Sequence, residues 1–130
     1  MSSVLDAWAT VAFLQGEPAA HRVRQALDDG AVICDINLGE VLYTLLRNRG
    51  REEALDAVRD LRGALDAEAP DWELTRTAAL MKAGGGLSYA DSFAVATAKR
   101  HRMPLLTGDP EILASSDLVE LVDLRGERTT

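Results

Sequence analysis

Short apolar runs alternate with longer stretches of helical periodicity along this chain, and this alternation restricts the fold more than any other feature. The short runs predict strands at residues 1–6, 31–34, 68–72, 104–107 and 119–122. Between them, apolar residues recur every three or four positions, which predicts helices over 7–15, 18–28, 38–49, 55–65, 74–81 and 89–102, with a helical turn at 110–113. Because the strands are apolar throughout, we expect a parallel sheet covered by helices on both faces. The sequence therefore predicts an α/β fold of three layers, α/β/α, around a short parallel sheet.

Length and cysteine content fit one domain in a reducing compartment. We expect a single domain over residues 1–125 and a polar tail at 126–130. Cys34 is the only cysteine and lies in an apolar run, so we expect a small buried hydrophobe. No run approaches the length of a membrane span, and no leader-like pattern is visible at the start. We therefore expect a cytoplasmic protein without a membrane anchor.

The net charge restricts how the chain could handle nucleic acid. Fourteen basic and 21 acidic residues give a formal charge of -7. That balance argues against a protein that holds nucleic acid by neutralising phosphates alone. It leaves a nucleic-acid substrate possible, because divalent cations bound by acidic side chains reverse the local potential.

Four acidic residues are expected at one edge of the sheet. Asp6 ends the first strand, and Asp109 follows the strand at 104–107 after one glycine. Glu40 and Asp91 fall in the first turns of predicted helices. In parallel α/β folds, ligands bind beyond the carboxyl ends of the strands. We therefore expect these acids to meet at a binding site.

Helix capping is the alternative explanation for two of the acids. Asn37 and Ser88 are good N-cap residues, and Glu40 and Asp91 follow them at the capping-box spacing. Taken singly, each of these two acids is better explained by capping. Capping gives no such reason for Asp6 and Asp109, where an unpaired carboxylate beside the core is costly. On this reasoning Asp6 and Asp109 carry the stronger evidence for a site.

A cluster of four carboxylates indicates a hard divalent cation. The acids would repel one another and raise each other's pKa unless a cation neutralised them. Mg²⁺ or Mn²⁺ prefers such oxygen ligands. Zinc is disfavoured, because the nitrogen and sulfur ligands are limited to His21, His101 and Cys34.

Five short motifs, in this order and at this spacing, resemble the PIN-domain ribonucleases, and in particular the VapC toxins of bacterial toxin–antitoxin pairs. The motifs are Val4-Leu5-Asp6-Ala7, Gly16-Glu17-Pro18, Asn37-Leu38-Gly39-Glu40-Val41, residues 87–94 (LSYADSFA) and residues 106–111 (LTGDPE). The resemblance covers nearly the whole chain. It implies a PIN-like fold and a metal-dependent endoribonuclease.

The resemblance also implies roles for individual residues. Asp6, Asp91 and Asp109 match principal Mg²⁺ or Mn²⁺ ligands, and Glu40 matches a ligand through water or the group that orients the nucleophilic water. Asn37 and Thr107 match supporting polar positions, and Glu111 is an extra acid at the rim. One position departs from the pattern, because Trp8 stands where many members have Ser or Thr.

The expected partners are an RNA substrate, a VapB-type antitoxin whose C-terminal peptide occupies a groove, and a second copy in a homodimer. The apolar surface of the first helices fits either a dimer face or the antitoxin groove. Arg47, Arg49 and Arg51 form the densest basic cluster, which suits contact with RNA phosphates or an ordinary helix ending. Both interpretations of the cluster stay open.

Other functions fit the same acids less well. Asp6, Thr10 and Asp109 also match motifs of haloacid-dehalogenase-like phosphohydrolases, but the general acid of that family would fall at Trp8. A receiver domain would need an acidic pair near the first strand and a lysine after a late strand, and both are missing. A non-catalytic PIN-like binding module would not need the four acids together. The phosphohydrolase and the binding module remain the alternatives.

Overall fold

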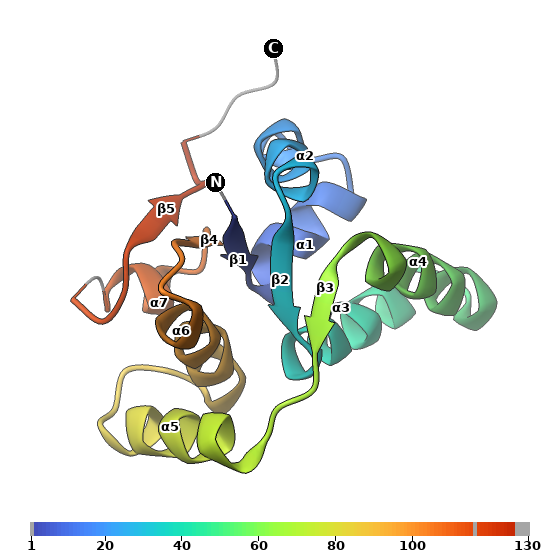
Figure 1. Ribbon diagram of the computed structural model, residues 1–130. Helices are drawn as coiled ribbons and strands as arrows, with labels where there is room; N and C mark the ends of the chain where they lie inside the picture. Colours follow the sequence, from blue (N-terminus) through green and yellow to red (C-terminus); the bar gives the residue numbers. More distant parts are fainter. Residues whose placement is uncertain (1, 116, 127–130) are drawn as a thin grey trace.

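A five-stranded parallel sheet forms the middle layer of the computed structural model, which describes residues 2–115 and 117–126 (Figure 1). The strands are β1 (Ser3–Leu5), β2 (Ala31–Cys34), β3 (Asp66–Glu68), β4 (Leu105–Thr107) and β5 (Leu121–Asp123). Their order is β3-β2-β1-β4-β5, with every neighbouring pair parallel. The predicted parallel α/β sheet is confirmed, and β1 lies at its centre.

Helices cover both faces of the sheet, which confirms the three-layer prediction (Figure 1). They are α1 (Ala7–Leu14), α2 (Ala20–Asp28), α3 (Asp35–Asn48), α4 (Arg51–Ala64), α5 (Trp72–Ala83), α6 (Tyr89–His101) and α7 (Pro110–Leu113). Successive residues of β1 face opposite layers, since side chains alternate along a strand. Leu5 packs in a core cluster with α1 and α2, and Val4 in one with α6 and α7. Burial on both faces explains why the strands are uniformly apolar.

Several element boundaries differ from the predictions. The weak strand expected at 68–72 is β3, which ends at Glu68, because Pro70 removes an amide donor and Trp72 already begins α5. The last strand is Leu121–Asp123 rather than 119–122. Pro18, expected in the first turn of the second helix, lies in the turn before α2.

The start of α3 is the boundary that matters for the site. The prediction made Asn37 its N-cap, but the helix begins at Asp35 and its N-cap is Cys34. The Cys34 side chain makes no capping hydrogen bond, so the sequence carried no signal for this early start. Asn37 is therefore a buried residue within the first turn of α3.

Two further expectations concern burial and the chain ends. Cys34 is a buried free cysteine, as predicted. Among the described residues, no helix is both long and apolar enough to cross a membrane. Of the predicted polar tail at 126–130, only Gly126 belongs to the described part of the chain.

Candidate active site

The structure brings Asp6, Glu40, Asp91 and Asp109 to the wall of one cavity of about 270 Å³. Asp6 follows the central strand β1, and Asp109 follows its neighbour β4. Glu40 and Asp91 come from the N-terminal parts of α3 and α6. The cavity therefore lies at the carboxyl edge of the sheet, where a parallel α/β fold presents ligand sites.

Asp6 is buried, with only 2% of its surface exposed, and it caps α1. One carboxylate oxygen accepts a hydrogen bond from the Ala9 amide at 2.8 Å, and the other accepts one from the Thr107 hydroxyl. Burial raises the pKa of Asp6 to about 7, despite both hydrogen bonds, and the charges of Asp91 and Asp109 add to the rise. The carboxyl is thus costly to ionise without a compensating charge.

Asp109 also caps a helix. Its Oδ1 accepts hydrogen bonds from the amides of Glu111 (2.8 Å) and Ile112 (3.2 Å) at the start of α7. Its own amide donates to the Thr107 hydroxyl at 2.9 Å. The prediction that capping does not explain Asp6 and Asp109 is therefore wrong, because a strand-end acid in this fold is also the residue before a helix.

Glu40 shows the opposite error. Because α3 begins at Asp35, Glu40 lies beyond its first turn and cannot complete a capping box. Instead its Oε1 accepts a hydrogen bond from Asn37 Nδ2 at 3.0 Å. Burial raises the pKa of Glu40, and the charge of Asp109 adds to this effect. The capping explanation of Glu40 is therefore wrong. Of the four acids, Glu40 is the one whose position helix capping does not explain.

Asn37 connects two of the site helices. Its Nδ2 donates both to Glu40 and to the carbonyl of Ala90 at 2.9 Å, one residue before Asp91. Its Oδ1 is buried and has no hydrogen-bond partner within the described part of the chain. This bridge fixes the spacing between Glu40 on α3 and Asp91 on α6.

Asp91 keeps the capping relation that the sequence predicted. Ser88 is the N-cap of α6, and its hydroxyl accepts the Asp91 amide at 3.1 Å. Burial raises the pKa of Asp91 to about 6, with further contributions from the charges of Asp109, Glu40 and Glu111. A residue can therefore occupy a capping-box position and still carry a perturbed carboxyl.

The donors in the cavity suit a hard cation, although they do not form a finished ligand set. Within residues 2–115 and 117–126, no three His, Cys, Asp or Glu side chains are grouped closely enough to hold a metal ion directly. Mg²⁺, however, usually binds through one or two carboxylates and keeps several waters. The carboxylates of this cavity raise one another's pKa, and no lysine, arginine or histidine of the described residues lines the cavity with them. They therefore provide the negative charge that such a hydrated ion requires.

The remaining predicted residues do not line the cavity. Thr107 is buried in β4 and bonds to two of the acids, whereas Glu111 is exposed on α7. The arginines do not line the cavity: Arg47 stacks over the Tyr43 ring at 5.0 Å, and Arg49 donates to the Leu14 carbonyl at 3.2 Å. Arg49 also ends α3, so for this residue the helix-ending interpretation has structural support.

Besides three small or aliphatic residues of α1, the cavity wall includes three residues that the sequence did not place there, which are Trp8, Glu17 and Thr44. Thr44 follows Glu40 by four residues on α3, and this helical spacing was a usable signal. Glu17 belongs to one of the five motifs. Trp8, which the sequence marked only as a departure from the family pattern, is partly buried. Its ring lies against Gly108, a contact across a hundred residues that no local pattern reveals.

Comparisons with known proteins agree with this architecture. The PIN domain family model matches residues 3–116. A chain of the DNA-bound VapBC complex from Salmonella typhimurium superposes with a TM-score of 0.77 at 14% identity, covering 95% of this chain and 99% of that one. The Mycobacterium tuberculosis toxin VapC20, described as cleaving the sarcin-ricin loop, gives 0.74 at 18% identity, covering 88% and 95%. A toxin–antitoxin complex from Klebsiella pneumoniae gives 0.72 at 18%, covering 95% and 98%. No curated protein matches the chain.

Proposed function

The chain belongs to the PIN domain family, and we propose that it is the cytoplasmic toxin of a toxin–antitoxin pair, an endoribonuclease that hydrolyses RNA phosphodiester bonds with Mg²⁺ or Mn²⁺. One observation carries the proposal: the four predicted acids and Glu17 line one small cavity at the carboxyl edge of the sheet, and among the described residues no basic side chain lines it with them. Such a charge arrangement costs folding stability, so it requires a function that repays it.

The proposed roles follow from what each side chain already bonds. Asp6, Asp91 and Asp109 would hold a hydrated Mg²⁺ or Mn²⁺, which would supply a water of lowered pKa and neutralise charge at the phosphate. Asp6 and Asp109 enter this role with orientations fixed by helix N–H groups. The Thr107 hydroxyl links the two residues, because it donates to the Asp6 carboxylate and accepts the Asp109 amide.

Glu40 is the proposed proton acceptor. Asn37 binds its Oε1, and Oε2 makes no hydrogen bond within the described residues. The free oxygen can take a proton from the attacking water, and the raised pKa makes Glu40 a better base than an ordinary glutamate. Proton transfer at Oε2 thus complements the cation held by the other acids.

The two rival functions differ in what they demand of Trp8 and the acids. A dehalogenase-like phosphohydrolase needs a carboxyl at position 8, where an indole ring packs against Gly108 instead. A non-catalytic module tolerates neutral replacements of the acids. The phosphohydrolase would lack its proton donor, and RNA cleavage by the wild type would exclude the non-catalytic module.

The test is cleavage of total RNA by wild-type protein in Mg²⁺, in Mn²⁺ and in EDTA. Asp91→Asn should lose at least about 100-fold in rate, the order expected for a positioned charged group. The matched control is Asp71→Asn. Asp71 is the N-cap of α5 and is paired with Arg100, which lies at the opposite end of α6 from Asp91. Cleavage that survives Asp91→Asn, or is absent from the wild type with both metals, contradicts the proposal.

The partners are proposed on weaker grounds and need their own test. Several solved structures of similar fold are toxin–antitoxin complexes, and three are described as bound to DNA, one of them to a promoter fragment. We expect this chain to bind a small VapB-type antitoxin and to form a homodimer. Co-purification with the product of an adjacent small reading frame, followed by mass determination with and without it, checks both expectations.

A further inference from the structure

Trp8 and Gly108 form a contact on which the geometry of the acid cavity depends. Gly108 joins β4 to α7, between Thr107 and Asp109. A Cβ atom added at Gly108 would overlap Cζ2, Cη2 and Cε2 of the Trp8 ring, well inside van der Waals contact. The backbone at Gly108 does not have a positive φ, so its conformation suits any residue. The three atoms nearest to such a Cβ all belong to the Trp8 ring.

The turn beneath this ring is held at both ends by hydrogen bonds. Thr107 donates its hydroxyl to Asp6 and accepts the amide of Asp109. Asp109 in turn accepts the first amides of α7. The middle residue has no side chain of its own, and the indole covers it. The segment that runs from β1 into α1 therefore contacts the turn after β4 at two points, through the Asp6 hydrogen bond and through the Trp8 ring.

We propose that Trp8 is a positioning residue that presses on Gly108 and so fixes the direction in which Asp109 enters the acid cavity. Its consequence for metal binding rests on the proposed function, whereas its effect on the turn does not. Trp8 is anchored for this role, because it packs against the buried cluster that contains Leu5 and Leu106.

A double-mutant cycle tests the contact in metal-free buffer. Gly108→Ala alone should lower the folding equilibrium constant by about 10- to 100-fold, because the new methyl group overpacks against the indole. In a Trp8→Ala background the same substitution should change it by less than about threefold. Equal losses in both backgrounds would show that the backbone, not Trp8, requires glycine, and would overturn the proposal. If Trp8→Ala does not fold, Trp8→Leu keeps apolar volume without the flat ring.

Local order distinguishes positioning from general support. In Trp8→Ala, hydrogen exchange of the Asp109 amide should accelerate at least tenfold beyond the change at core amides, and Trp8→Phe should restore protection. Mn²⁺ affinity, measured from the electron spin resonance of free Mn²⁺, should fall at least fivefold in Trp8→Ala and recover in Trp8→Phe. Uniform acceleration at all amides overturns the proposal. If the wild type binds no Mn²⁺ but the exchange result holds, the metal function fails and the positioning role stands.

Discussion

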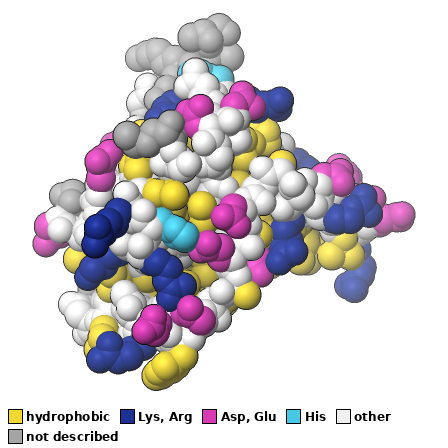
Figure 2. Space-filling model, in the orientation of Figure 1, with side chains coloured by type: hydrophobic (Ala, Val, Ile, Leu, Met, Phe, Trp, Pro, Cys, Tyr) yellow, Lys and Arg dark blue, Asp and Glu magenta, His cyan; other side chains and the backbone are white. Residues whose placement is uncertain are grey.

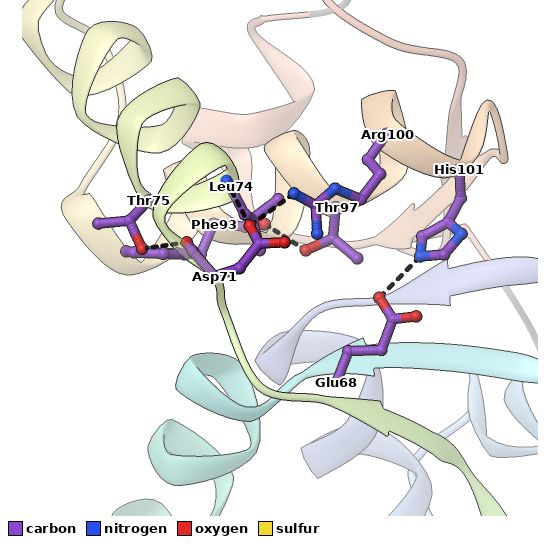
Figure 3. Close-up of polar contacts among 8 residues, drawn as sticks. All are labelled: Glu68, Asp71, Leu74, Thr75, Phe93, Thr97, Arg100 and His101. Carbon is purple, nitrogen blue, oxygen red and sulfur yellow. Dashed lines mark hydrogen bonds and ion pairs between the residues drawn. The ribbon is translucent and has the colours of Figure 1, made fainter.

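Acidic side chains lie in opposite electrostatic surroundings near the two ends of helix α6. At the start of the helix, Asp91 faces other carboxylates across the cavity, and its pKa is raised to about 6. Near the other end, Asp71 pairs with Arg100 at 2.7 Å and Glu68 bonds to His101 at 2.7 Å (Figure 3). The hydrogen bond from Arg100 holds the pKa of Asp71 below its usual range. One end of the helix is balanced, and the other is short of positive charge.

The surface around the balanced end shows the same mixture. Figure 2 shows Lys and Arg interspersed with Asp and Glu over the α5–α6 side of the molecule. A hollow of about 610 Å³ there is larger than the acid cavity, and its lining includes Trp72, Arg76, Lys99 and Arg100. Size alone therefore does not identify the functional site in this protein. The acid cavity is our candidate because its negative charge is uncompensated, whereas buried charged groups in folded proteins are normally paired.

The largest expected difference between the two ends is in the pH dependence of stability. In the folded, metal-free protein Asp6 stays protonated up to about pH 7, whereas in the unfolded chain it ionises near its ordinary pKa of 3.8. Folding therefore takes up protons, and stability falls as pH rises from about 4 to 7. Asp6→Asn should reduce this fall by roughly 2–4 kcal/mol at pH 7 and leave the smaller part that the raised pKa of Asp91 contributes. Urea unfolding at pH 4 and pH 7 measures it; a wild-type curve with no such fall would refute the perturbed carboxyl.

A bound cation should reverse this penalty. Mg²⁺ at about 100 times its dissociation constant should stabilise the wild type by about 2.7 kcal/mol. For a domain of this size that is a rise in Tm of several degrees. Asp91→Asn should lose the rise, and Asp71→Asn should keep it. Equal Mg²⁺ effects on both variants would mean that the ion acts away from the cavity.

Thr107→Val tests the hydrogen bonds inside the acid site. The valine keeps the volume but leaves an oxygen of Asp6 and the amide of Asp109 without their shared partner. We expect a loss of about 2 kcal/mol at pH 7. The loss should be smaller at pH 4, where Asp6 is protonated. Unfolding curves at the two pH values provide the comparison.

The smallest effect is expected at the balanced end. Asp71 and Arg100 form an exposed ion pair, and such pairs contribute little. Arg100→Met should shift Tm by no more than about 2 °C. A larger shift would mean that this cluster supports the α5–α6 packing more strongly than its exposure indicates.

The sequence predicted the sheet and the four acids because both depend on local patterns. Apolar runs mark buried parallel strands, and an acid directly after such a run must lie at the sheet edge. The same locality explains the errors. The start of α3 at Asp35 has no capping side chain to announce it, so Asn37 and Glu40 were given the wrong places on the helix. The capping by Asp6 and Asp109 became visible only when the helices were seen to begin directly after those residues.

Contacts between distant segments were beyond any local pattern. Trp8 meets Gly108, and Asn37 reaches the carbonyl of Ala90, 53 residues away. Neither pair differs from ordinary core or capping residues in its own surroundings. The strand order brings β1 beside β4 and so places Trp8 against Gly108, and the packing of α3 against α6 places Asn37 beside Ala90.

The hydrogen bond from Thr107 to Asp6 spans 101 positions of the chain. Asp6 is therefore made before its partner, and most of the helices and strands lie between them in the chain. Until Thr107 and Asp109 are synthesised, the growing polypeptide lacks two of the groups that define its cleft. A chain interrupted before β4 would therefore lack the complete cleft, even with every preceding helix in place.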